Sequence, residues 1–364
     1  MLPITFSQLQ SLSFKNLLKI FIWVIFRNFQ FKNKKKYSSV FFVDKVIDNN
    51  LYLPVDIEIV EDINENTLII INKFKIIKLL KNIFRLNSIR LADKDFFLTS
   101  EASTSMRLWY FDFSSKEERT VYDSISTRNL DRLVSKFNNE KICILGTGPS
   151  FESALKIFQE NDNNIITCNS AIYQNNLWDE KKHILCFADP VYHFGKSEEA
   201  SRFKSEVIKK FNNKKFFIVC PIECFPILRD SWGIDENFII GLSRNSESQY
   251  RNIDNEFIDI KKTSNILTEY MLPLSSMLSK SIFLGGFDGR EKNEKNFWKY
   301  SKTTNQDIYE HQIQHPSFFK DRDMKKYYYS HLSILEKQID DLEKKGFIIK
   351  NVTSSNIQFL NDRK

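Results

Sequence analysis

The chain has 364 residues, of which 42% are hydrophobic and 14% aromatic, so it can bury a sizeable core and is neither a disordered nor a fibrous protein. Its formal net charge is +7, yet residues 1–43 alone contain seven basic side chains and no acidic one, so the remainder of the chain is balanced. A nucleic-acid-binding protein is expected to spread positive charge over a whole face, and that class is therefore disfavoured.

Residues 17–26 (LLKIFIWVIF) are strongly apolar but too few to cross a bilayer, which takes about 20 residues. A secretory signal fits poorly, because no small-residue cleavage site follows the apolar run. Aromatic residues flanked by lysine and arginine are typical of segments that lie in the interface of an anionic membrane. Residues 1–36 are therefore predicted to bind such a membrane surface, with a helix docked on the protein's own core as the alternative.

Residues 37–135 are predicted to form a small α/β domain of unknown role. Its expected strands lie within residues 37–43, 51–60 and 67–71, and an amphipathic helix is expected over residues 73–84. The stretch 113–141 is polar, with a helical pattern only at its end. It is predicted to be a connector to the rest of the chain.

From residue 141 onward, short apolar runs alternate with amphipathic helices. Strands are expected in KICIL, NIITC, KKHILCF, KKFFIVC, NFIIGL, SIFLGG and FIIKNV, with helices after the first strand and over residues 264–280 and 325–345. This alternation predicts an α/β fold with a mainly parallel sheet covered by helices on both faces. Residues 141–364 are thus predicted to be a Rossmann-like catalytic domain, whose ligands sit at the carboxyl ends of the strands.

Most of the cysteines lie inside these predicted strands. Their number is odd, and no short-spaced Cys/His quartet occurs, which argues against a disulfide framework or a zinc site. They are predicted to be small buried hydrophobes in a reducing, cytosolic compartment. The five residues are Cys143, Cys168, Cys186, Cys220 and Cys224.

The first strand of this domain is followed by Gly146-Thr147-Gly148-Pro149-Ser150. Two glycines let the backbone approach a phosphate, and Pro149 suits a helix start. Ser153 stands where the third glycine of a dinucleotide fingerprint would fall, and the Walker lysine is absent. The turn therefore favours a nucleoside monophosphate or a sugar nucleotide over NAD or ATP, with a purely structural turn as the alternative.

Polar residues also follow the other strands or open the next helix. Each can bind a ligand or cap a helix, but several of them around one sheet edge favour a binding site. The candidates are Asn169, Ser170, Asp189, Thr263, Ser264, Gly286 and Asp288.

These segments carry a resemblance. The motifs GTGPS, CNSAIY, DPVYHF, TSNILTEYMLPL with KSIFLGGFDG, and LEKKGFIIKNVTSSN occur in this order over residues 141–356. In order and spacing the chain resembles the bacterial sialyltransferases of glycosyltransferase family 42 and related proteins with a GxGPS start. Residues 1–135 lie outside the resemblance.

The resemblance implies a metal-independent transferase that uses a CMP-activated acidic sugar and has no other cofactor. It implies one GT-A-like nucleotide-binding domain with a lid at about residues 289–330. By matched position, Thr147 and Asn169 would contact the nucleotide, and the backbone of residues 146–150 would face the phosphate. Ser264 would contact the donor, and Asp288 would hold cytidine or order the lid.

The resemblance also implies a catalytic histidine and lid tyrosines. The histidine falls on His331, with His315 as its competitor, because His315-Pro316 forms a dipeptide that marks nucleotide binding in other bacterial sialyltransferases. Tyr300 and Tyr309 are the tyrosine candidates. Asp189 departs from the family's asparagine, and a carboxylate beside an anionic donor is repulsive unless it is protonated, paired or used in chemistry. Asp189 is therefore also a candidate catalytic base or nucleophile.

Together these features predict a glycosyltransferase that moves Kdo or sialic acid from its CMP donor to a glycan or lipid-linked acceptor of a surface polysaccharide or lipooligosaccharide. It is expected on the cytoplasmic face of the bacterial inner membrane. Two alternatives remain open: an ATP-dependent pyrophosphokinase-like enzyme in which Asp189 and Asp288 bind Mg²⁺, and a non-catalytic module of an assembly complex. The DxD-like Asp321-Arg322-Asp323 is predicted to cap the helix that follows rather than to bind a metal.

Overall fold

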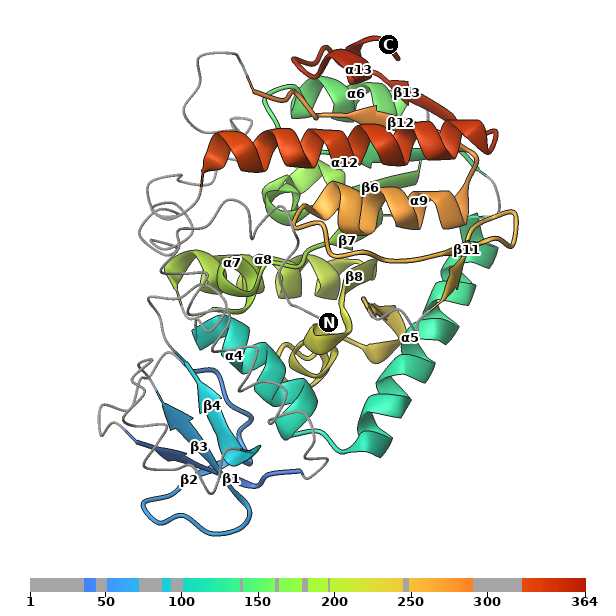
Figure 1. The fold of residues 1–364 in the computed structure, drawn as a ribbon. Helices are drawn as coiled ribbons and strands as arrows, with labels where there is room; N and C mark the ends of the chain where they lie inside the picture. Colours follow the sequence, from blue (N-terminus) through green and yellow to red (C-terminus); the bar gives the residue numbers. More distant parts are fainter. Residues whose placement is uncertain are drawn as a thin grey trace.

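A computed structural model places the strands in one large parallel sheet, one small parallel sheet and a two-stranded hairpin (Figure 1). The large sheet has seven strands in the order β13-β12-β5-β6-β7-β8-β9, and every neighbouring pair is parallel. The residues that the structure describes are 36–43, 51–71, 87–92, 101–137, 140–160, 164–178, 183–195, 197–244, 249–290 and 323–364.

The predicted strands of the C-terminal domain are all present in the large sheet. The α/β class and the parallel arrangement are confirmed, and the architecture is compatible with a Rossmann-like fold. The seven strands are β5 (Ile142–Leu145), β6 (Asn164–Cys168), β7 (His183–Cys186), β8 (Phe217–Pro221), β9 (Ile239–Leu242), β12 (Ser281–Gly285) and β13 (Ile348–Asn351).

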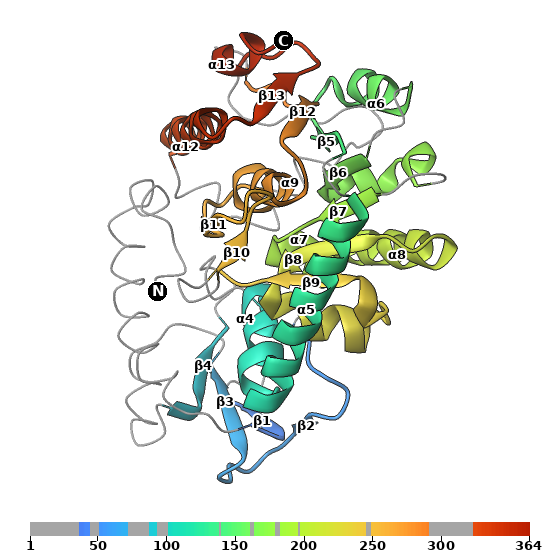
Figure 2. The same cartoon turned by 90° about the vertical axis from the view of Figure 1, so that its right-hand side faces the viewer.

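Helices cover both faces of the large sheet, because successive strand side chains point to opposite sides. In β5, Ile142 and Ile144 pack with one core cluster, while Cys143 and Leu145 pack with the other. Figure 2 shows the two helical layers on either side of the strands. One face carries α9 (Leu272–Leu278) and α12 (Met324–Lys344), and the other carries α6 (Phe151–Glu160) and α8 (Glu198–Asn213).

The cysteines pack inside the sheet as predicted. All five are free and buried. Burial raises the pKa of Cys143 and Cys168 to about 12, so neither thiol ionises near neutral pH.

The small sheet has the order β2-β1-β3-β4, with all pairs parallel. Its strands are β1 (Ser39–Phe42), β2 (Glu58–Ile59), β3 (Thr67–Ile71) and β4 (Ile89–Leu91). β3 is buried along its whole length, as its apolar sequence predicts. The strand expected over residues 51–60 is only two residues long and exposed, because residues 54–57 form a turn in which the Ile57 amide donates to the Pro54 carbonyl at 3.2 Å. The helix expected over residues 73–84 lies outside the described residues.

The predicted connector is instead a helix of the main core. Residues 113–141 contain α5 (Lys116–Phe137), which packs against β9. Its polar composition hides one apolar face, because the side chains that it buries recur every three or four residues. They include Tyr122, Ile125, Leu130, Leu133 and Phe137.

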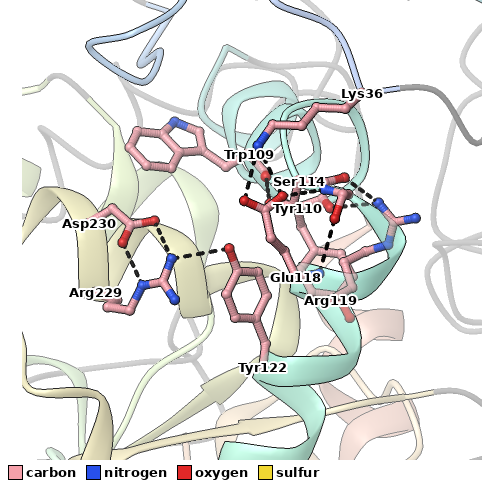
Figure 3. A network of polar contacts seen from close by, with 10 residues as sticks. Lys36, Trp109, Tyr110, Ser114, Glu118, Arg119, Tyr122, Arg229 and Asp230 are labelled. Atoms are coloured by element: carbon pink, nitrogen blue, oxygen red, sulfur yellow. Dashed lines mark hydrogen bonds and ion pairs between the residues drawn. The ribbon is translucent and has the colours of Figure 1, made fainter.

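The start of α5 is fastened by a capping box. Ser115 Oγ accepts a hydrogen bond from the Glu118 amide, and Glu118 accepts one from the Ser115 amide. Lys36, just before β1, forms an ion pair with Glu118 at 3.0 Å (Figure 3). Arg119 donates to the carbonyls of Tyr110, Phe111 and Ser114. These contacts join the segment that leads into the small sheet to α5, the helix that packs on the large sheet.

Among the described residues, no helix combines the length and apolarity that crossing a membrane requires. The predicted membrane-binding segment, residues 1–36, lies outside the described residues except for Lys36.

The remaining described elements are short. They are α4 (Glu101–Arg107), η3 (Leu108–Asp112), η4 (Asn169–Tyr173), η5 (Asn175–Leu177), α7 (Pro190–Phe194), η6 (Ile222–Cys224), η7 (Ile227–Ser231), η8 (Glu236–Phe238), β10 (Tyr250–Arg251), β11 (Phe257–Ile258), η9 (Leu267–Met271) and α13 (Gln358–Asn361).

Candidate functional site

The strand order of the large sheet reverses between β5 and β12. From β5 the chain adds strands outward as far as β9, and it then returns to place β12 on the other side of β5. In open parallel sheets this is the position where ligands bind, at the carboxyl ends of the strands. The loops that meet there are residues 146–150, after β5, and residues 286–290, after β12.

These two loops touch one another through their backbones. The amide of Gly146 donates to the carbonyl of Gly285 at 2.8 Å, and the amide of Gly148 donates to the carbonyl of Gly286 at 3.0 Å. A Cβ atom on Gly146 would lie 2.6 Å from the carbonyl oxygen of Gly286. Both predicted glycines of the first loop therefore permit a close loop–loop contact.

Asp288 occupies the start of α6. Its Oδ2 accepts a hydrogen bond from the Ser150 amide at 3.1 Å and would lie 2.3 Å from a Cβ atom on Gly148. The carboxylate thus stands where the sequence predicted a phosphate, and the amides of Gly146, Gly148 and Ser150 all have acceptors within the chain. A phosphate bound at this edge must use side chains or displace Asp288.

Several predicted site residues carry buried polar atoms without a partner. A buried polar atom that makes no hydrogen bond costs about 1–3 kcal/mol, so such atoms are rare in folded proteins. Five of them belong to residues around the carboxyl edge of the large sheet, where α9 and α12 also begin. Within the described part of the chain, no hydrogen-bond partner exists for Ser150 Oγ, Asn169 Oδ1, Ser170 Oγ, Ser264 Oγ or His331 Nδ1.

Two of these residues also have an unfavourable backbone conformation. Asn169, directly after β6, has φ = 48°, and Ser264, before η9, has φ = 65°. In the described residues, Asn255 is the only other non-glycine residue with a positive φ. Strained backbone persists where the surrounding structure imposes it, and it is concentrated at functional sites. Strain and unpartnered atoms thus coincide at Asn169 and Ser264.

Ser264 is held by a carboxylate and by α12. Glu269 Oε2 accepts hydrogen bonds from the amides of Thr263 and Ser264, both at 3.0 Å. The hydroxyl of Tyr327 donates to the carbonyl of Ser264 at 2.7 Å. Thr263 has a structural contact, because its hydroxyl lies 2.7 Å from that of Thr268.

Tyr327 precedes His331 by four residues, so the two side chains lie on the same face of α12. Because Tyr327 contacts Ser264, this face, with His331 on it, is directed toward Ser264. It is 9% exposed, and burial lowers the pKa of its imidazole to about 4. His331 is therefore neutral at pH 7. A general base is most effective when its pKa lies near the working pH, and desolvation holds the pKa of His331 below that range.

The competitor His315, both tyrosine candidates and most of the expected lid lie outside the described residues. Asp323 caps α12 as predicted, since its carboxylate accepts from the amide of Lys326 at 3.0 Å. Among the described residues, no group of three or more His, Cys, Asp or Glu side chains is arranged to hold a metal ion.

Asp189 is the N-cap of α7. Its Oδ1 accepts hydrogen bonds from the amides of Val191 at 2.9 Å and Tyr192 at 3.1 Å. Its own amide donates to Nδ1 of His193 at 3.1 Å. Of the roles predicted for Asp189, capping is therefore the one that its contacts display.

Replacing Asp189 by Asn is expected to change the free energy of unfolding by less than about 0.5 kcal/mol, because Asn caps helices as well as Asp does. Asp189→Ala should cost about 1 kcal/mol, since the amides of Val191 and Tyr192 lose their acceptor. Denaturant unfolding of both variants measures this. An Asp189→Asn variant as unstable as Asp189→Ala would show that the negative charge, and not the cap, stabilises this turn.

Polar residues also follow β8 and β9, and they were not among the residues predicted from the sequence. Glu223 follows β8 and Arg244 follows β9, and the guanidinium of Arg244 contacts both Glu223 and Glu269. The rule that identified the other candidates, namely polar residues after a strand end, applied here as well. Its use on these two strands would have found them.

Comparison with protein-family models, curated proteins and solved structures gave no match to this chain.

Proposed function

We propose that the protein is a glycosyltransferase that moves an acidic keto-sugar, Kdo or sialic acid, from its CMP donor to a glycan or lipid-linked acceptor. The observation that carries the proposal is the set of five unpartnered polar atoms around the carboxyl edge of the large sheet. A ligand rich in hydroxyl and phosphate oxygens would satisfy hydroxyl donors and amide or imidazole acceptors of this kind.

The proposed chemistry needs donors for the leaving phosphate and one base. The donor sugar would leave CMP through an oxocarbenium-like state, and the hydroxyls of Ser150 and Ser264 would stabilise the departing phosphate. Asn169 and Ser170 would bond the ribose or the base. His331 is uncharged at pH 7, so its imidazole can accept the proton of the acceptor hydroxyl.

The parts outside the described site complete the proposal. The expected lid would close over the donor and exclude water, and residues 1–36 would hold the enzyme at an anionic membrane where a lipid-linked acceptor lies. The small parallel sheet would then belong to a separate N-terminal domain.

Thermal-shift measurements with CMP, CDP, UDP, GDP and ATP, each with and without Mg²⁺, test the proposal. CMP at about 100 times its dissociation constant should stabilise the protein by about 2.7 kcal/mol, without a requirement for Mg²⁺. A shift with ATP and Mg²⁺ alone would indicate the pyrophosphokinase-like alternative. A chain that responds to no nucleotide would indicate the assembly module.

Asn169→Ala is expected to weaken CMP binding about tenfold, because it removes the unpartnered amide from the proposed nucleotide site. Asn255→Ala is the matched control, since Asn255 also has a positive φ (63°) but is exposed, in the turn between β10 and β11. Both variants carry similar backbone strain, and only the first should lose CMP affinity by isothermal titration. Equal affinities would place the nucleotide elsewhere.

A further inference from the structure

Ser264 has a conformation that its place before η9 does not require. A serine in front of a helix usually caps it: the backbone is extended, and the hydroxyl accepts a hydrogen bond from an amide two or three residues further on. Ser264 instead has φ = 65°, and its hydroxyl has no hydrogen-bond partner in the described part of the chain. The capping contact comes from Asn265, whose Oδ1 accepts from the amide of Leu267 at 2.9 Å. The conformation of Ser264 therefore has another cause.

Two side chains from other segments bind the peptide groups on either side of Ser264. On one side, Glu269 Oε2 accepts hydrogen bonds from the amides of Thr263 and Ser264, both at 3.0 Å. On the other side, the hydroxyl of Tyr327 in α12 donates to the carbonyl of Ser264 at 2.7 Å. Glu269 and Tyr327 are both buried, so water competes little with these contacts. They fix the backbone of Ser264 and do not use its hydroxyl.

The donors that surround Glu269 require a carboxylate. Its Oε2 takes the two amides, and its Oε1 takes the guanidinium of Arg244 at 3.0 Å. A glutamine has only one acceptor oxygen, so its amide nitrogen would face one of these donors. Arg244 supplies the positive charge that a buried carboxylate needs, and it also contacts Glu223 at 3.4 Å. The segments after β8 and β9 are thereby connected to the backbone of Ser264.

We propose that Glu269 and Tyr327 are positioning residues, which impose the strained backbone of Ser264 and so hold its hydroxyl in place for a ligand. Backbone strain persists where surrounding contacts impose it, and a buried hydroxyl without a partner does not stabilise the ligand-free protein. That the ligand is the phosphate of a CMP donor rests on the proposed function. The positioning does not, and it can be measured as a stability without any ligand.

A double-mutant cycle on the full chain, read by denaturant unfolding, tests the positioning. Ser264→Gly should raise the folding equilibrium constant about fivefold, because glycine adopts a positive φ without strain and the unpartnered hydroxyl is removed. After Glu269→Gln or Tyr327→Phe the backbone can relax, so the same change should bring almost no gain. Measuring one substitution in several backgrounds cancels the effect of glycine on the unfolded chain.

Glu343→Gln and Tyr328→Phe are the matched control backgrounds. Glu343 also pairs with an arginine, Arg363, at 2.7 Å, and the hydroxyl of Tyr328, a second buried tyrosine of α12, accepts from the amide of Arg290 at 3.0 Å. Neither contact involves Ser264, so the fivefold gain should persist in both controls.

An equal gain from Ser264→Gly in every background would overturn the proposal, since Glu269 and Tyr327 would then only support the fold. Tyr327→Phe removes a single oxygen atom, and it decides the question alone if Glu269→Gln does not fold.

Isothermal titration with CMP on the same proteins separates the positioning from the proposed function. Glu269→Gln and Tyr327→Phe should each weaken CMP binding about tenfold, but should bring no further loss in the Ser264→Gly protein, where the positioned hydroxyl is already absent. Losses that add regardless of Ser264 would overturn the positioning role. A parent chain that binds no CMP but keeps the stability coupling would retain the positioning and reject the proposed function.

Discussion

His331→Ala is expected to lower the turnover of sugar transfer by roughly 10²–10⁴-fold, the usual effect of removing a general base. CMP affinity should stay within about twofold, because the base acts on the acceptor hydroxyl and not on the nucleotide. Turnover with CMP-sialic acid and with CMP-Kdo, and the CMP thermal shift, measure the two effects. Tyr329→Ala is the matched control, since Tyr329 lies on the same helix with 58% of its surface exposed.

The pH dependence gives an independent check on His331. Burial holds the pKa of its imidazole at about 4, below the ordinary value of 6.5. The imidazole stays neutral and able to accept a proton until the pH falls through about 4. The acid limb of kcat/KM should therefore lie well below pH 6.5. Normal turnover in the His331→Ala variant would show that another residue is the base, and the fold would be unaffected.

Gly286→Ala is expected to destabilise the protein by about 3 kcal/mol, through a steric and a conformational effect. Gly286 has φ = +78°, which an L side chain adopts only with strain. An added Cβ atom would also lie 2.3 Å from the carbonyl oxygen of Gly146 and 2.9 Å from its carbon. Both are backbone atoms, so relief requires the loops after β5 and β12 to separate. Denaturant unfolding measures the loss.

Gly346→Ala separates the two effects. Gly346, in the turn between α12 and β13, has φ = +82°, and no atom lies within 4 Å of a Cβ atom added there. Its substitution should cost only the conformational strain, about 1–2 kcal/mol. The free energy of unfolding of the Gly286 variant should therefore be lower than that of the Gly346 variant, and the difference is the steric cost of the added Cβ atom. Equal losses would mean that the two loops separate freely, and the proposed site would then lack its rigid frame.

The secondary structure after residue 141 was predictable because the strands are short, mostly apolar and separated by turn residues. In the runs Ile142–Leu145 and His183–Cys186 every residue is buried, which is the pattern of strands covered on both faces. The polar stretch before this domain was predicted wrongly as a connector. In α5, the few apolar residues of the buried face are separated by many polar, exposed ones over 22 residues, so the local sequence reads as polar. The contact with β9 is what identifies the buried face.

The sequence by itself determined the parallel sheet, the burial of the cysteines and which residues follow the strands, because these depend on local apolar runs and their order. Only the tertiary structure decided what those residues do. Asp288 reaches the start of α6, 138 residues earlier in the chain, and Asp189 caps its own helix. Ser264 Oγ and His331 Nδ1 become buried without partners only once α12 packs against the segment before η9. Such contacts join distant segments, and no local pattern encodes them.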